Sequence, residues 1–282
     1  MTFKKGAYCR YDAGVKVENA VGGLRIFLPA ERGYINYNLV HSVVPERNCD
    51  TWRLGVAYAT DENFGNEFPL TPPGAEWDMA IRIKDRPDFI GGFAHGDEIY
   101  DTLSVKIDGN VADIESLSEL TPFSELVIGI SSLGFDPLDS KTQALRHFKE
   151  FSINEGGVSL NQRVEWLNDY TLATSYMAMM PPLKTLTESF YTDADTEPKA
   201  ARENYDKPIS GASRAVVFGA ESGISYTMSV KFPHLVGGDR FLLSDNSRGL
   251  YNKMYFVICN GAEVSKGSVI ETLTKYVIEK TK

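Results

Sequence analysis

One short stretch of the 282-residue chain is dense in groups that can do chemistry. Residues 91–98 read Gly-Gly-Phe-Ala-His-Gly-Asp-Glu, so that an imidazole and two carboxylates follow a pair of glycines. Glycine allows close backbone approach, and an imidazole beside a carboxylate is what an acid–base pair or a metal site needs. We therefore predict that a catalytic site would contain His95 and Glu98, with Asp97 contributing to ligand binding.

This stretch also resembles the zinc-binding segment of the succinylglutamate desuccinylase and aspartoacylase family, in which the His and the Glu ligate zinc. The chain departs from that segment in three ways. It has one extra residue between Gly92 and His95, it continues into a strand-like pattern, and the family's Asp-Leu-Asn-Arg element is missing. The four histidines also lack the close spacing of a strong metal motif, so we predict no metal and no cofactor.

The same residues fit a structural role as well. Two glycines followed by Asp97 and Glu98 are typical of a bulge or tight turn capped by a carboxylate, with His95 hydrogen-bonded to backbone. Both alternatives stay open at this point. His147 and His234 fit better as structural histidines with satisfied hydrogen bonds.

Aromatic residues beside polar groups form a second set of candidates. The chain has 14 Tyr, 15 Phe and 3 Trp, and both Trp52 and Trp77 adjoin charged residues. Aromatic faces stack on sugar rings while neighbouring polar groups bind the hydroxyls, so we predict that Trp52 and Trp77 bind a ligand. Trp166 is in phase with apolar neighbours and is expected in the core.

A third group of candidates follows residue 247. A lyase that acts on an acidic glycan needs a cation to neutralise charge and a Tyr or His base. We predict catalytic roles for Arg248 and Tyr251 and a ligand-binding role for Lys253. The sequence contains no Gly-x-Ser-x-Gly, phosphate-binding loop or dinucleotide-binding motif.

Strands are the elements that must position these groups. Polar and apolar residues alternate in residues 157–166, where Val158, Leu160 and Trp166 share one face. Similar alternation occurs at residues 24–29, 34–44, 52–59, 79–84, 103–108, 126–131, 225–232, 255–259 and 272–278. Strands without β-α alternation predict an all-β fold, a large antiparallel β-sandwich of the jelly-roll or super-sandwich type with few short helices.

Turn residues separate the strands. Asp-Gly-Asn at 108–110, Glu-Gly-Gly at 155–157 and Asn-Gly at 260–261 predict hairpins. Residues 139–150 predict a helix, and the polar residues 192–201 predict an exposed loop or a short helix.

The domain organisation predicted from this pattern is a single large β-sandwich over residues 1–282. Two smaller β domains divided near residues 192–208 are the alternative. Exposed sheet edges must be covered or paired, so a homo-oligomer or a larger assembly is expected to cover them.

Composition and charge argue against several classes of function. The net charge is -9, and the basic residues are scattered, which predicts no binding to nucleic acid. No apolar run approaches the ~20 residues of a membrane span, and residues 1–6 are not followed by an apolar signal-peptide core. We therefore expect a soluble protein without a membrane span, either cytoplasmic or released as part of a virion or other assembly.

The overall texture resembles the sugar-binding sandwiches of bacteriophage tail and virion proteins. The aromatic strand at 163–167, the segment at 176–182 and the lack of a signal peptide carry this resemblance. It implies a carbohydrate-binding module that acts as a virion or tail component. The alternative is a polysaccharide lyase or hydrolase, with or without a metal, that uses His95, Asp97 and Glu98.

Overall fold

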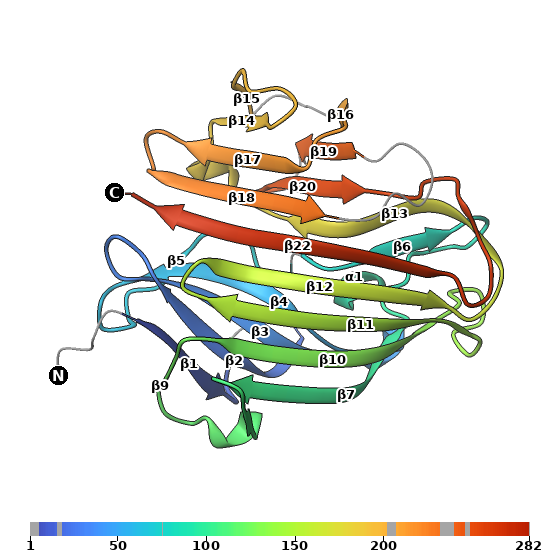
Figure 1. Ribbon diagram of the computed structural model, residues 1–282, viewed down its shortest axis with the longest axis horizontal. Coiled ribbons are helices and arrows are strands. Elements are labelled where there is room, and N and C mark those ends of the chain that lie inside the picture. The colour runs from blue at the N-terminus through green and yellow to red at the C-terminus, as the bar shows by residue number, and fades with distance from the viewer. Residues whose placement is uncertain are drawn as a thin grey trace.

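Strands dominate the computed structural model, which describes residues 6–15, 19–74, 76–201, 207–231, 240–245 and 249–281 (Figure 1). Its one α-helix over these residues, α1 (Gly92–His95), is a single turn, and the 3-10 helices cover Pro45–Arg47, Ile114–Ser116 and Lys184–Leu186. No helix in this part of the chain is long and apolar enough to cross a membrane.

The described strands form one long sheet and one short sheet. In the long sheet the neighbours are, in order, β15 (Lys199–Ala200), β14 (Ser189–Thr192), β17 (Arg214–Gly219), β18 (Ile224–Lys231), β22 (Val269–Lys280), β12 (Gly157–Trp166), β11 (Gln143–Asn154), β10 (Leu126–Phe135), β7 (Glu98–Ile107), β4 (Cys49–Thr60), β3 (Tyr34–Val44), β2 (Ala20–Pro29), β1 (Ala7–Asp12) and β9 (Thr121–Phe123). At its side, β5 (Phe68–Pro69) pairs with β4, and β8 (Asn110–Ala112) pairs with β7.

The short sheet is centred on one long strand. Its order is β16 (Lys207–Ser210), β19 (Arg240–Asp245), β20 (Asn252–Val257), β13 (Tyr170–Met180) and β21 (Glu263–Val264), with β6 (Ala80–Ile83) also paired to β13. Strand pairing in the described chain is antiparallel except where Cys49 and Asp50 of β4 meet Glu98 and Ile99 of β7 in the parallel sense.

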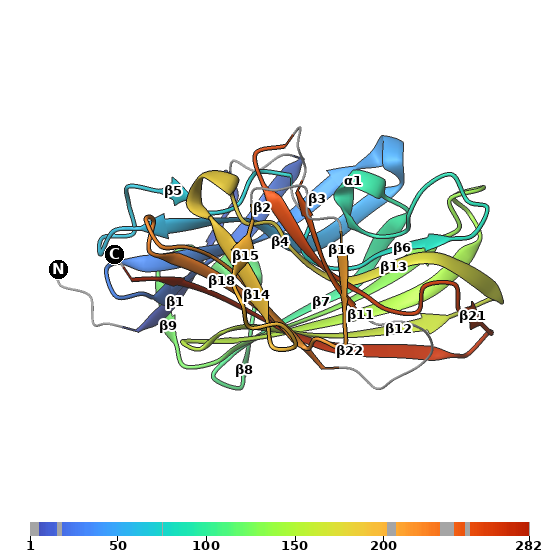
Figure 2. The ribbon, with the colours of Figure 1, turned by 90° about the horizontal axis from the view of Figure 1, so that it is seen from above.

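The long sheet curves round so that it contributes strands to both layers of a β-sandwich, and the short sheet completes one of these layers. Seen from above, β2, β3, β4, β6 and β13 lie on one side, and β7, β11, β12 and β22 lie on the other (Figure 2). The layers also touch directly, because the Ile278 backbone N–H on β22 donates to the Tyr37 hydroxyl on β3 at 3.0 Å. The sequence-based prediction of a large, mostly antiparallel all-β sandwich is therefore confirmed.

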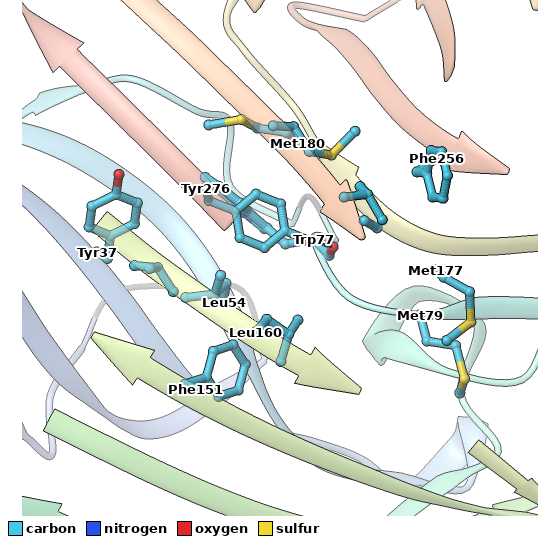
Figure 3. Packing of buried hydrophobic residues seen from close by; sticks show 14 of the residues in the cluster. Tyr37, Leu54, Trp77, Met79, Phe151, Leu160, Met177, Met180, Phe256 and Tyr276 are labelled. Carbon is cyan, nitrogen blue, oxygen red and sulfur yellow. Dashed lines mark hydrogen bonds between the residues drawn. The ribbon is translucent and has the colours of Figure 1, made fainter. Parts of the chain in front are cut away.

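The core fills the space between the layers. One cluster of buried side chains extends from Ala7 to Ile278 and includes Phe151 on β11, Tyr276 on β22 and Trp77 on the segment before β6 (Figure 3). Burial of each large apolar side chain stabilises the fold by about 1.5–3 kcal/mol. The three cysteines lie buried as free thiols, and burial raises the pKa of Cys9 to about 12.

The turn predictions are mostly confirmed. The glycines of 108–110 and 155–157 connect paired strands, with Ile107 opposite Asn110 and Asn154 opposite Gly157. Asn260-Gly261 makes a turn, but the strands on its two sides, β20 and β21, both pair with β13 and do not form a hairpin. Part of the segment 192–201 belongs to the β14–β15 hairpin.

The helix predicted at residues 139–150 is wrong. The chain enters β11 at Gln143, and its side chains alternate between buried and exposed positions through residue 154. Two of the buried positions hold His147 and Lys149, whose polarity hid the period-two pattern.

Candidate functional site

His95 is the last residue of α1. This helix lies between the β3–β4 hairpin and the strands β6 and β13 (Figure 2). The His95 ring donates its Nδ1–H to Asp88 Oδ1 at 2.8 Å, since an ionised carboxylate can only accept. Its Nε2 lies 3.8 Å from Glu76 Oε2, which is too long for a hydrogen bond. The Asp88 contact therefore fixes the ring and leaves Nε2 directed at Glu76.

Two carboxylates hold the backbone of α1 in place. Glu76 Oε1 accepts from the Ala94 N–H at 3.0 Å, and Glu98 Oε2 accepts from the Gly92 N–H at 3.3 Å. The helix is possible because Gly91, Gly92 and Gly96 adopt φ of 106°, 71° and 91°, a region that side chains disfavour. The glycines of the 91–98 segment thus allow the helical turn that ends at His95, and the hydrogen bonds to Glu76 and Glu98 hold this turn in place.

Aromatic rings line the space beside His95. The Phe89 ring lies 4.7 Å from the His95 ring and 5.8 Å from the Tyr176 ring, and the Tyr176 ring lies 4.6 Å from that of Tyr255. Lys253 Nζ lies 5.2 Å from the centre of the Tyr255 ring. Tyr176 and Tyr255 are half-buried, on strands β13 and β20 of the short sheet.

Electrostatics also connect Lys253 to this region. Burial lowers the pKa of the Lys253 ammonium, and the negative charge of Glu76 opposes that shift. We call the group formed by Glu76, Asp88, Phe89, His95, Tyr176, Lys253 and Tyr255 the His95 cluster. Its imidazole and its aromatic rings are half-buried and Asp88 is exposed, whereas Glu76 and Lys253 are buried.

A buried ionic network lies beneath the cluster. Glu98 accepts from His147 Nδ1 at 3.1 Å and lies 3.6 Å from Lys149 Nζ, and Lys149 Nζ lies 3.3 Å from Asp78 Oδ2. His147 Nε2 also donates to Gln162 Oε1 at 3.1 Å, as both ring nitrogens face acceptor oxygens. Each of these ionisable side chains is at most 7% exposed, so the network is interior to the sandwich.

The buried network contacts two parts of the chain that carry the His95 cluster, α1 and strand β13. Glu98 fastens α1 through the Gly92 N–H, and Gln162 Nε2 donates to the Met177 carbonyl, next to Tyr176. Burial by itself would raise the pKa of Glu98, but Lys149 and His147 outweigh it and hold that pKa below its usual range. For Asp78 burial dominates, and its pKa is raised.

The fold has a clear counterpart among solved structures. A galactose mutarotase-like protein from Clostridium acetobutylicum has a TM-score of 0.50 at 8% identity, over 99% of this chain and 100% of that one. The chain therefore shares its β-sandwich fold with that protein.

Two other structures are similar at lower scores. A putative aldose 1-epimerase from Escherichia coli K12 has a TM-score of 0.44 at 9% identity, over 90% of this chain and 99% of that one. The galactosidase domain of an alpha-galactosidase-sucrose kinase has a TM-score of 0.46 at 11% identity, over 91% of this chain. This chain spans 41% of the length of that last protein. No protein-family model matches the chain, and no curated protein matches it in sequence.

The structure brings together two of the residues predicted from sequence, His95 and Lys253. Glu98 lies inside the sandwich and contacts α1 from below. Asp97 is also buried, where it accepts from Asn48 Nδ2 at 3.2 Å. Tyr251 is half-buried and forms a bridge with Leu183.

The remaining predicted residues do not join the cluster. Trp52 and Trp77 are 4% and 1% exposed and belong to the core, so neither indole is available to stack on a sugar in this structure. Arg248 and His234 lie outside the described residues. In the described chain, no three His, Cys, Asp or Glu side chains are grouped so as to hold a metal ion.

Sequence reasoning missed Glu76, Asp88, Tyr176 and Tyr255 as site residues. Two weak signals were present. Glu76 directly precedes Trp77 in a stretch with two carboxylates, and Tyr255 is in phase with Lys253 on one strand. Neither signal shows that β6, β13 and β20 lie side by side.

Replacing Gly92 by alanine is expected to displace α1. A Cβ at this position would lie 2.0 Å from Glu76 Oε1, in addition to the strain of φ +71°. Gly109, with φ +82° and nothing within 4 Å, is the matched control for the strain alone, about 1–3 kcal/mol. Urea unfolding should show a larger loss for Gly92→Ala than for Gly109→Ala, and equal losses would contradict the close contact with Glu76.

Proposed function

We propose that the protein binds a carbohydrate at the His95 cluster. The observation that carries this proposal is the row of Phe89, Tyr176 and Tyr255 rings beside hydrogen-bonding groups on Glu76 and His95. Rings of this kind offer apolar faces to a sugar ring, while charged neighbours bind its hydroxyls.

The fold supports the same substrate class. The similar structure from Clostridium acetobutylicum is described as galactose mutarotase-like, which associates this sandwich with a sugar. Fold similarity by itself does not transfer function, so the proposal of carbohydrate binding rests on the residues of the His95 cluster. Association with a virion or phage tail, and a homo-oligomeric state, stay predictions from the sequence.

Removing one ring of the row tests the proposal. We expect Tyr255→Ala to weaken glycan binding about tenfold or more, since a base or sugar stacked on an aromatic ring gains about 1–3 kcal/mol. Phe148→Ala is the control, because Phe148 is an exposed ring on β11, in the long sheet.

A glycan array followed by titration with the best ligand gives the measurement. Equal affinities of Tyr255→Ala and the wild-type protein, or loss in Phe148→Ala as well, would count against the cluster as the binding site. Scoring the same array for cleaved products tests the lyase or hydrolase predicted from the sequence.

A second candidate function is catalysis on the bound sugar by proton transfer. The observation in its favour is that Asp88 fixes the His95 ring with Nε2 directed at Glu76, so one imidazole and one carboxylate face the same space. Interconversion of the anomers of an aldose requires one group that donates a proton and another that removes one. Polarimetry of freshly dissolved galactose, with and without the protein, would detect that reaction.

A further inference from the structure

A separate cavity of about 260 Å³ lies on the face of β1–β4 that is turned away from the core. Side chains on these strands alternate, so that Ile26 and Leu39 enter the core while Arg25 and Asn38 project to the other side. Asp12, Tyr58 and Glu67 complete the wall of the cavity. None of these residues belongs to the His95 cluster.

An irregularity between β3 and β4 shapes the cavity floor. Tyr37 pairs with Ala57 and Leu39 pairs with Leu54, so Asn38 alone faces two residues, Gly55 and Val56. Asn38 Nδ2 donates to the Val56 carbonyl at 2.9 Å. Its Oδ1 has no hydrogen-bond partner among the residues that the structure describes, although the residue is only 3% exposed. A buried acceptor without a partner is unfavourable, and a ligand hydroxyl that donates to it would remove that cost.

Arg25 supplies donors at the same cavity. Its guanidinium is 13% exposed and forms an ion pair with Glu67. Burial and the nearby Arg10 lower the pKa of Arg25, while Asp12 and Tyr58 oppose that shift. The Arg25 guanidinium is thus largely shielded from water and lies close to Glu67, Asp12 and Tyr58.

The mixture of charges selects the chemistry of a ligand. Asp12 and Glu67 are balanced by Arg25 and the nearby Arg10, so the cavity carries no net charge that would favour an anion or a cation. A neutral hydroxyl can both donate to Asn38 Oδ1 and accept from Arg25, and the Tyr58 ring offers an apolar face. The volume of about 260 Å³ lies just below the roughly 300–1,000 Å³ of pockets that hold drug-sized ligands, which suits a small ligand such as one sugar ring.

We propose that this cavity is a second binding site, one that takes a single neutral sugar ring or a polyol of similar size. It is independent of the His95 cluster, because the two sites share no residue. A chain with both sites would hold two sugar units at once.

Titration with D-galactose, D-glucose and myo-inositol, followed by saturation-transfer NMR, tests the second site. Arg25→Gln and Tyr58→Ala should each weaken one binding event for at least one of these probes about tenfold, and any event that depends on the His95 cluster should keep its affinity in both variants. Tyr191→Ala is the control, because Tyr191 is a half-buried tyrosine on β14. Circular dichroism checks folding, and Arg25→Gln decides the matter if Tyr58→Ala fails to fold.

The outcomes separate the two sites. Binding that is lost in His95→Ala and unchanged in Arg25→Gln would overturn the second site and leave the proposed function intact. Two binding events, one weakened by Arg25→Gln and the other by His95→Ala, would support both sites, whereas a single event that is lost in Arg25→Gln and unchanged in His95→Ala would support the second site and count against the first for that probe. Saturable binding of inorganic phosphate or spermidine in place of the neutral probes would also overturn the proposal.

Discussion

Lys149→Met is expected to lower the free energy of unfolding by about 3–5 kcal/mol, because removal of one partner leaves buried charge without compensation. Lys149 is 2% exposed and is the cation that Glu98 and Asp78 share. Its Nζ also donates to the Trp52 carbonyl at 2.7 Å, which would lose that donor. Methionine is of similar length, so cavity formation contributes little to the loss.

The two carboxylates of the network should respond differently to neutralisation. Glu98 has a lowered pKa, so its charge stabilises the fold above the unfolded value of about 4.3, and that contribution is lost as the pH falls. Asp78 has a raised pKa, so its contribution is present at low pH and is lost as the pH rises above about 3.9. At pH 7 Glu98→Gln should therefore destabilise the protein much more than Asp78→Asn.

Urea unfolding at pH 7 and at lower pH measures these differences. The cost of Glu98→Gln should shrink as the pH falls below about 4, because the wild-type protein then loses the contribution that the variant lacks. Lys275→Met, an exposed lysine on β22, is the control and should change stability by less than about 0.5 kcal/mol. Similar losses for Lys149→Met and Lys275→Met would show that the network does not stabilise the fold.

The fold could be predicted from local patterns because period-two alternation is a local property. Residues 157–166 show it clearly, and they form β12 with the bounds Gly157–Trp166. The prediction failed at β11, where His147 and Lys149 occupy interior positions that apolar residues normally fill. Their partners Glu98 and Asp78 lie far away in the sequence, so no local pattern shows that these charges are compensated.

The candidate site could be predicted only in part for the same reason. The density of chemical groups in residues 91–98 predicted His95 as a site residue, which stays a prediction, and spacing could not show on which side of α1 each carboxylate lies. Glu98 follows His95 closely in sequence and yet lies inside the sandwich, whereas the more distant Glu76 faces the imidazole. Trp52 and Trp77 have polar neighbours in sequence, but the pleat of β4 directs the Trp52 ring into the core, and Trp77, on the segment before β6, is buried there as well.

His95→Ala and Glu76→Gln should each lower sugar turnover about 10²–10⁴-fold if the cluster is catalytic, the range typical of acid–base groups. Each substitution removes one of the two groups that would move a proton. Asp88→Asn should have a smaller effect, because it keeps the ring in place while weakening the contact that fixes the Nδ1 proton. Galactose anomer interconversion followed by polarimetry gives the rate, and NMR titration gives the affinity separately.

Asp97→Asn distinguishes the site found in the structure from the one predicted by spacing. Asp97 has φ of 52°, which asparagine tolerates, and it contacts Asn48 rather than His95. Turnover and affinity in this variant should stay within about twofold of wild type, because an asparagine Oδ1 can still accept from Asn48 Nδ2 and the substitution changes no residue of the His95 cluster. If Asp97→Asn loses as much as Glu76→Gln, the assignment of Glu76 as the partner of His95 is wrong. If the wild-type protein binds galactose without interconverting its anomers, proton transfer is not its function, and His95→Ala should then change affinity alone.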